Sequence, residues 1–258
     1  MLIRNSWLAG VLALLAATGA QAADLKPTIV LVHGAFADAS SWDGVIAELL
    51  KDGYPVVAAA NPLRGVAVDA AAVGSLVASV KGPVVLVGHS YGGTVISAAA
   101  SDAPNVKALV YVSAFAPDIG ETSFGLTGKF PGSTLSAALA PRAPLPGAGA
   151  DLYIQQDLFG AQFAADVPVD RARRMAVEQR PLAEAAGGEA SVSAAWKATP
   201  SWWIWGEADR NIPPQTMAFM ARRAQARKVV TIPGASHVVM ISHPHAVADL
   251  IETAAAAR

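Results

Sequence analysis

Short apolar runs alternate along this chain with amphipathic stretches. The apolar runs predict six strands, at residues 28–32, 56–60, 84–87, 109–112, 202–205 and 228–232. Several runs are apolar at consecutive positions, as is typical of strands whose two faces are both covered by helices.

The amphipathic stretches predict helices at residues 41–51, 69–80, 94–100, 214–227 and 246–257. The first has Asp43 in its first turn and Gly53 just beyond its end, which are common signals at the two ends of a helix. Strands that alternate with helices predict an α/β fold, with about six mostly parallel strands and helices on both faces.

Residues 118–200 break this alternation, because they contain no good strand pattern. Residues 131–149 hold four prolines and three glycines, and residues 151–186 are helical only in pieces. A loop of this length inside a compact domain is usually functional. We expect a cap over the carboxyl edge of the sheet; a linker between two domains is disfavoured, since neither flank makes a complete sheet alone.

Residues 1–22 have the pattern of a secretory signal peptide. Arg4 precedes an apolar run at residues 8–17, and Ala20-Gln21-Ala22 matches an A-x-A cleavage site. The run is shorter than the ~20 residues that a spanning helix needs. We therefore expect residues 23–258 to form one domain that is periplasmic or secreted; an uncleaved anchor or an ordinary N-terminal helix is the alternative.

Composition narrows the class of protein. Of the 258 residues, 53% are apolar and 15% are charged, which excludes a disordered segment. The formal charge of −1 disfavours a nucleic-acid binder. The chain has no cysteine, so disulfides, thiolate metal sites and a cysteine nucleophile are excluded. No H-E-x-x-H, P-loop or G-x-G-x-x-G motif occurs, so neither a metal nor a nucleotide cofactor is expected.

The candidate nucleophile is Ser90, in the sequence Gly88-His89-Ser90-Tyr91-Gly92-Gly93. This matches G-x-S-x-G directly after a predicted strand and directly before a predicted helix, which is the context that the motif requires. The turn is expected to strain Ser90, while Gly88 and Gly92 let neighbouring backbone approach closely. The hydroxyl is then presented at the positive end of a helix.

A serine nucleophile needs a base, and the chain offers five histidines. We expect His33 and His89 to satisfy hydrogen bonds around the loops, and His243 and His245 to lie near the surface. His237 directly follows the last predicted strand, so it is the predicted base.

The predicted acid is Asp209, just beyond the strand at 202–205, with Glu207 and Asp118 as competitors. The order Ser90, Asp209, His237 along the chain is the order found in this type of sheet.

The expected oxyanion hole is formed by the backbone N–H groups of Ala35, in the loop after the first strand, and Tyr91. Phe36 and Trp42 are expected to line the substrate pocket, with simple packing as the alternative for both.

Five segments carry a resemblance to a known family: LVHGAFADASSW, GPVVLVGHSYGG, YVSAFAPDIGE, ADRNIPP and SHVVMISHP. The chain resembles the α/β-hydrolase superfamily over the region after residue 22, and within it a bacterial group similar to salicylate esterases. It is more distantly similar to the plant methylesterase and hydroxynitrile lyase family, which shares an HGA oxyanion loop and a small cap.

The resemblance implies ester hydrolysis without a cofactor, through an acyl-enzyme on Ser90, Asp209 and His237. Serine at the elbow argues against dehalogenases and epoxide hydrolases of this fold, which carry aspartate there. We therefore expect a secreted serine hydrolase acting on small apolar or aromatic carboxylic esters. A lactonase or lyase using the same triad is one alternative. A non-catalytic ligand-binding protein is the other; the oligomeric state stays open.

Overall fold

A six-stranded parallel sheet forms the centre of the molecule, in the order β2-β1-β3-β4-β8-β9. The computed structural model describes residues 26–145 and 149–257. The strands are β1 Thr28–Val32, β2 Val56–Ala59, β3 Val84–His89, β4 Val106–Val112, β8 Ser201–Gly206 and β9 Lys228–Ile232. Every neighbouring pair in this sheet is parallel, which confirms the predicted fold class. The predicted signal peptide lies outside the described residues.

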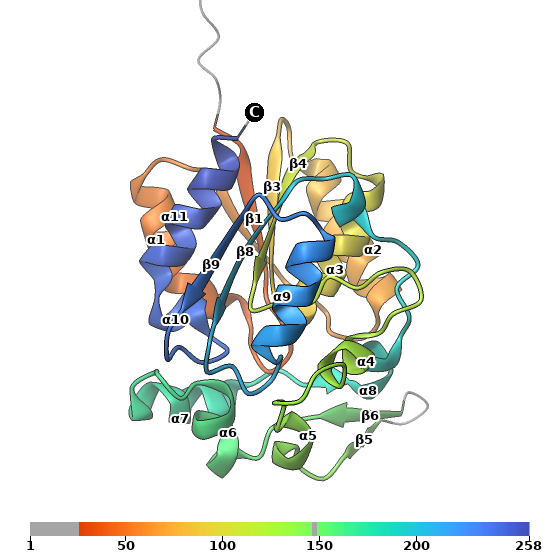
Figure 1. The fold of residues 1–258 in the computed structure, drawn as a ribbon, viewed down its shortest axis with the longest axis vertical. Coiled ribbons are helices and arrows are strands. Elements are labelled where there is room, and N and C mark those ends of the chain that lie inside the picture. Colours follow the sequence, from red (N-terminus) through yellow and green to blue (C-terminus); the bar gives the residue numbers. More distant parts are fainter. Residues whose placement is uncertain (1–25, 146–148, 258) are drawn as a thin grey trace, which may run out of the picture.

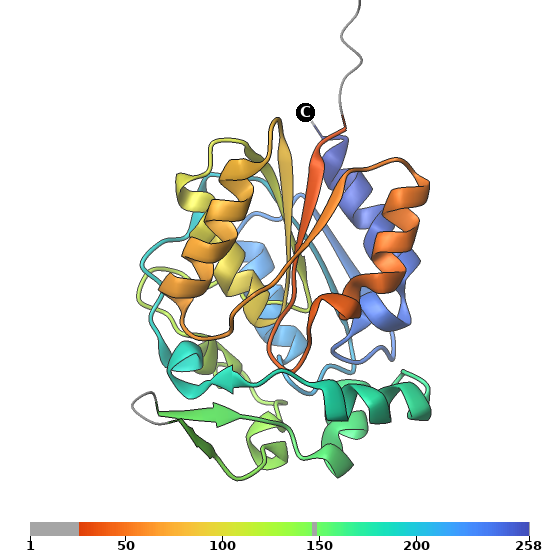
Figure 2. The same cartoon turned by 180° about the vertical axis from the view of Figure 1, so that it is seen from behind.

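Helices cover both faces of the sheet, as Figures 1 and 2 show from opposite sides. One face carries α1 Asp43–Lys51 and α11 Pro244–Ala255, with the short α10 Val239–Ser242 beside them. The other carries α2 Val66–Ser79, α3 Tyr91–Ala99 and α9 Pro214–Arg223. Because both faces are covered, all six residues of β3 and all six of β8 are buried. This accounts for the continuous apolar runs in the sequence.

The cap is built from the segment between β4 and β8, and it lies across one end of the sheet (Figure 1). Its helices are α4 Ser123–Thr127, α5 Leu135–Ala138, α6 Gln156–Phe163, α7 Val169–Glu178 and α8 Glu184–Gly188. The expectation that this segment lacks strands is wrong. The cap contains a small antiparallel sheet of β5 Ala143–Leu145, β6 Gly149–Leu152 and β7 Leu182–Ala183.

These cap strands have only two to four residues each, and one of them contains Pro144. Runs this short show no period-2 alternation, and proline is tolerated in an edge strand because its missing N–H faces away from the ladder. The ladder between β6 and β7 joins residues about thirty positions apart, so tertiary contacts stabilise a strand that the local sequence does not indicate.

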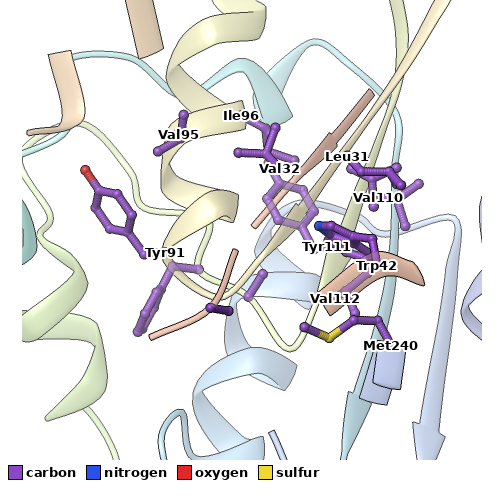
Figure 3. Packing of buried hydrophobic residues seen from close by; sticks show 14 of the residues in the cluster. Leu31, Val32, Trp42, Tyr91, Val95, Ile96, Val110, Tyr111, Val112 and Met240 are labelled. Carbon is purple, nitrogen blue, oxygen red and sulfur yellow. The ribbon is translucent and has the colours of Figure 1, made fainter. Parts of the chain in front are cut away.

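The core is continuous across the sheet, and it includes aromatic side chains that the sequence did not separate from a binding site. Tyr111 of β4 stacks on Trp203 of β8, with ring centroids 4.3 Å apart. Figure 3 shows Trp42 among the buried hydrophobic residues of this core. No helix in the described part of the chain is long and apolar enough to cross a membrane.

Candidate active site

Ser90 stands at a sharp turn between β3 and α3. Its backbone has φ 53° and ψ −124°, a conformation that non-glycine residues rarely adopt, as the motif predicts. Backbone hydrogen bonds hold the turn: the Ser90 carbonyl accepts from Gly93 N at 2.9 Å and from Phe115 N at 3.1 Å. The strain is therefore maintained by the surrounding sheet and by the first turn of the helix.

Two glycines make this turn possible by close backbone approach. A Cβ on Gly88 would lie 2.6 Å from the Gly92 carbonyl oxygen, and a Cβ on Gly92 would lie 2.5 Å from the Val32 carbonyl oxygen. Real Cβ atoms do not approach so closely, so both positions need glycine, as the sequence predicts.

Gly34 has the same role, and sequence reasoning missed it. It belongs to the loop after β1, and a Cβ there would lie 2.6 Å from Ser90 Cβ and 2.7 Å from the His89 carbonyl oxygen. The loop after β1 therefore lies directly against the serine turn. The signal in the sequence was Gly34 itself, between the buried strand and Ala35.

His237 and Asp209 come together in the loops after β9 and β8. The His237 Nδ1 lies 2.7 Å from Asp209 Oδ2, and both side chains are almost fully buried. Because a carboxylate only accepts hydrogen bonds, Nδ1 carries the proton and donates, which leaves Nε2 free to act as a base. Asp209 Oδ1 accepts from Asn211 N at 2.8 Å and Ile212 N at 3.0 Å, so the carboxylate is fixed at both oxygens.

The competing acids lie elsewhere. Asp118 pairs with Lys197 at 2.5 Å, and this hydrogen bond lowers the pKa of the Asp118 carboxyl. Glu207 is exposed to solvent. Among the candidates, only Asp209 contacts His237 in the described residues.

The other histidines lie as expected from the sequence. His33 Nε2 accepts from Asn61 N at 3.2 Å, and His89 Nε2 lies 3.2 Å from the His237 carbonyl oxygen. Burial lowers the pKa of both imidazoles, well below the usual value for His89, and so favours their neutral forms. His243 and His245 are partly or largely exposed.

A small cavity, here called the Ser90 cavity, brings the candidate residues to one place. Ser90, His237, Ala35, Tyr91 and Phe36 all line it. Apolar side chains from the sheet domain and the cap form most of the remaining wall: Phe115, Phe124, Leu135, Leu139, Leu152, Phe163, Leu182 and Ile212. In the described part of the chain, no hydrogen bond joins the Ser90 hydroxyl to His237; such contacts often tighten only when substrate is bound.

The two backbone N–H groups predicted for the oxyanion hole donate to no acceptor within the described part of the protein. Among the described residues, neither Ala35 N nor Tyr91 N donates a hydrogen bond, whereas Phe36 N donates to the Arg180 carbonyl at 2.9 Å. Phe36 N is therefore occupied by the cap, and Ala35 N and Tyr91 N remain available to a ligand.

Trp42 does not lie where the sequence analysis expected it. Its side chain is fully buried and is absent from the wall of the Ser90 cavity. It packs edge-on against the His89 ring, with centroids 6.4 Å apart. Trp42 therefore packs against His89, the residue before the serine, and the packing alternative is the correct one for this residue.

The cap covers His237 through Phe163, the last residue of α6. The Phe163 ring packs against the His237 ring with centroids 5.1 Å apart, and it also contacts Phe36 and His89. The neighbouring Gln162 donates to Asn211 Oδ1 at 3.1 Å, while Asn211 Nδ2 donates to the Gln162 carbonyl at 3.1 Å. This pair fastens α6 to the loop that carries Asp209.

A second residue that the sequence did not single out is Asp69, in the first turn of α2. It is fully buried, and its carboxylate accepts from the Tyr91 hydroxyl at 2.9 Å and from Arg64 N at 3.1 Å. Burial raises the pKa of the Asp69 carboxyl, and these hydrogen bonds oppose the shift. The carboxylate anchors the side chain of Tyr91, the residue that follows the serine. In the sequence, Asp69 could have been noticed as the one acidic residue in the apolar, alanine-rich stretch that forms α2.

This arrangement contains the parts that acyl transfer uses. A serine at a strained strand–helix turn shares an apolar cavity with an imidazole, whose far nitrogen is held by a buried carboxylate.

The chain belongs to the alpha/beta hydrolase family, whose model matches residues 29–250. The carbendazim hydrolyzing esterase of Nocardioides sp. (strain SG-4G) is 34% identical over 113 residues, which are 39% of this chain and 47% of the esterase. The alignment therefore spans about half the length of that relative.

Two solved structures share the fold. Polyneuridine aldehyde esterase has a TM-score of 0.76 at 20% identity, covering 88% of this chain and 98% of that chain. A pyrethroid hydrolase from Sphingobium faniae JZ-2 has a TM-score of 0.70 at 22% identity, and the match covers 90% of this chain and 98% of the hydrolase chain. The resemblance of the sequence motifs to the α/β-hydrolase superfamily is confirmed.

Substitution of Gly34 tests the contact between the β1 loop and the serine turn. In Gly34→Ala the new Cβ must displace Ser90 or the His89 carbonyl, so we expect a loss of about 1–3 kcal/mol in the free energy of unfolding. Denaturant titration measures it. The control is Gly74→Ala in α2, where nothing lies within 4 Å, and it should be neutral or slightly stabilising. Equal stability of the two variants would contradict the argument.

Substitution of Asp69 tests the buried anchor of Tyr91. In Asp69→Asn the amide oxygen can keep the bond from Arg64 N, while the NH2 faces the Tyr91 hydroxyl, which must then accept and leaves its own O–H without this acceptor. We expect a destabilisation of about 1–3 kcal/mol, measured by urea denaturation. The exposed Asp102 gives the control, since Asp102→Asn should change stability by less than about 0.5 kcal/mol. A change at Asp69 no larger than at Asp102 would rule out the anchor.

Proposed function

We propose that this protein is a serine hydrolase of carboxylic esters, with Ser90 as nucleophile, His237 as general base and acid, and Asp209 as the carboxylate that orients the imidazole. The hydrogen bond of 2.7 Å between His237 Nδ1 and Asp209 Oδ2, buried beside the cavity that Ser90 lines, carries the proposal. The proposal also includes the predicted export of the protein from the cytoplasm.

The first half of the reaction acylates Ser90. His237 Nε2 takes the hydroxyl proton as Ser90 Oγ attacks the ester carbonyl, and the carbonyl oxygen gains negative charge. The backbone N–H groups of Ala35 and Tyr91 donate to that oxygen, and the start of α3 adds a favourable dipole. The tetrahedral intermediate collapses when the C–O bond breaks, and His237 gives its proton to the departing alcohol.

The second half releases the acid by the same route. Water takes the place of the alcohol, and His237 removes its proton as the water oxygen attacks the acyl carbon. The second tetrahedral intermediate collapses when the bond between the acyl carbon and Ser90 Oγ breaks, and His237 returns its proton to Oγ, which releases the acid and restores the Ser90 hydroxyl. Asp209 keeps its position throughout, because its two oxygens accept hydrogen bonds from His237, Asn211 and Ile212. It stabilises the imidazolium that forms in each half.

The wall of the Ser90 cavity favours an apolar or aromatic substrate. Leucine and phenylalanine side chains dominate it, and Phe36 contributes from the oxyanion loop. The esterase and hydrolase names of the relatives agree with an ester substrate.

Removal of the nucleophile tests the proposal. Hydrolysis of p-nitrophenyl butyrate by the wild type should fall by at least about 10³-fold in Ser90→Ala. The melting temperature should stay close to that of the wild type, because the Ser90 hydroxyl makes no hydrogen bond within the described residues. If the folded wild type hydrolyses none of a panel of esters, the proposal is overturned. Cyanohydrins and lactones are included in the panel to detect the alternative lyase and lactonase reactions.

The role of the acid is tested by Asp209→Asn. Two backbone N–H donors face Oδ1, so the amide oxygen of asparagine takes that position and its NH2 faces His237. His237 Nδ1 must then accept, which moves the proton to Nε2 and removes the base. We expect kcat to fall by about 10⁴-fold.

The matched control is Asp118→Asn, which changes a half-buried carboxylate that binds Lys197 and Ile119 N and does not line the Ser90 cavity, so it should keep wild-type kcat. A large loss in Asp118→Asn, with little in Asp209→Asn, would reverse the assignment of the acid.

A further inference from the structure

The Ser90 cavity is too small to hold a long ester by itself. Its free volume is about 40 Å³. One water-sized group needs roughly 10–15 Å³, so the cavity accommodates about three such groups. An ester group with a short chain fills it, and any longer arm must extend beyond its wall.

A much larger space adjoins it inside the cap. This cap groove has a volume of about 1030 Å³ and runs between α4, the loop at 130–133, α5 and the end of β6. Its apolar lining includes Phe124, Phe130, Leu135, Leu139 and Leu152. A groove of this size and composition matches the usual properties of sites for small organic ligands.

One layer of side chains separates the two spaces. Phe124, Thr127, Leu135, Leu139 and Leu152 line the Ser90 cavity and the cap groove alike. Leucine and phenylalanine can change rotamer without breaking a hydrogen bond, so we expect movement of these side chains to join the two spaces.

Phe124 is the most exposed of these five. Its side chain is 41% accessible to solvent, although it is large and apolar. The ring lies over Gly187 of α8, where a Cβ would come within 2.2 Å of the Phe124 Cζ. Glycine at 187 therefore leaves room for the ring at the boundary between cavity and groove.

The charged side chains of the groove neutralise each other. Arg142 and Glu184 both line it and form an ion pair at 2.5 Å. No other lysine, arginine, aspartate or glutamate lies in the lining. The groove therefore suits an uncharged ligand.

We propose that the cap groove is the binding site for an extended, uncharged apolar arm of the ester, carried on either its acyl or its alcohol side. This inference rests on the proposed function, and it assigns the substrate class: esters with one arm longer than the Ser90 cavity accepts. Five side chains line both the groove and the cavity of Ser90, so a ligand in the groove lies next to the serine. For this reason we assign the groove to an arm of the substrate itself.

The test fills the groove without touching the Ser90 cavity. Ser136 of α5 is exposed and lines only the groove, so Ser136→Trp places an indole in it. The substrates are methyl acetate, methyl octanoate and hexyl acetate, with acid release followed by titration. We expect kcat/KM to fall about tenfold or more for at least one long ester. For methyl acetate, which has no arm beyond one methyl group on either side of the ester, it should stay within about twofold, and the long ester that responds identifies the arm.

The matched control is Ala137→Trp, on the same short helix. Ala137 is exposed and does not line the groove, so this variant should leave all three substrates unchanged. Equal losses for short and long esters in Ser136→Trp, or no loss for any, would overturn the proposal.

A binding measurement separates this inference from the proposed function. In the Ser90→Ala background, hexyl acetate and methyl octanoate are titrated by calorimetry, with and without Ser136→Trp. Weaker binding of a long ester in the double variant supports the groove even if the wild type hydrolyses no ester. Unchanged binding of both esters overturns it, whatever the activity.

Discussion

The close packing of backbone around Ser90 is the constraint on which the rest of the site depends. The loop after β1, the end of β3 and the start of α3 meet there with no room for a side chain at Gly34, Gly88 or Gly92. Because the segments are this close, the serine keeps an unfavourable φ of 53°, held by bonds to its own carbonyl. The same contact brings Ala35 beside Ser90, so one packing arrangement positions both the nucleophile and the predicted oxyanion donors.

The carboxyl ends of the parallel strands supply the remaining groups. Asp209 follows β8 and His237 follows β9, and these strands are neighbours in the sheet. A buried imidazole and a buried carboxylate would each be costly alone, but paired at 2.7 Å they satisfy one another. The cap completes this environment, because Phe163 covers the imidazole and Gln162 is fastened to Asn211 beside the acid.

Most of the fold could be predicted because both faces of the sheet are buried. Burial of that kind requires apolar residues at consecutive positions, and the six strands are visible as such runs. The cap could not be predicted to the same degree. Its strands have two to four residues and are stabilised by pairing with distant segments, so no local period marks them. Trp42 shows a similar limit, since an aromatic residue after an oxyanion loop suits a pocket wall and a core equally well.

The sequence by itself determined the α/β fold class and the candidates Ser90, Asp209 and His237. Ser90 could be found because a strained turn needs glycines at fixed spacing. Asp209 and His237 could be found because parallel strands bring their carboxyl ends to one edge of the sheet. Only the tertiary structure decided which acid faces His237, where Trp42 packs, that buried Asp69 holds Tyr91, and that a broad groove lies beyond a small cavity. Those outcomes depend on contacts between residues far apart in the chain, and such contacts have no periodic signature in the sequence.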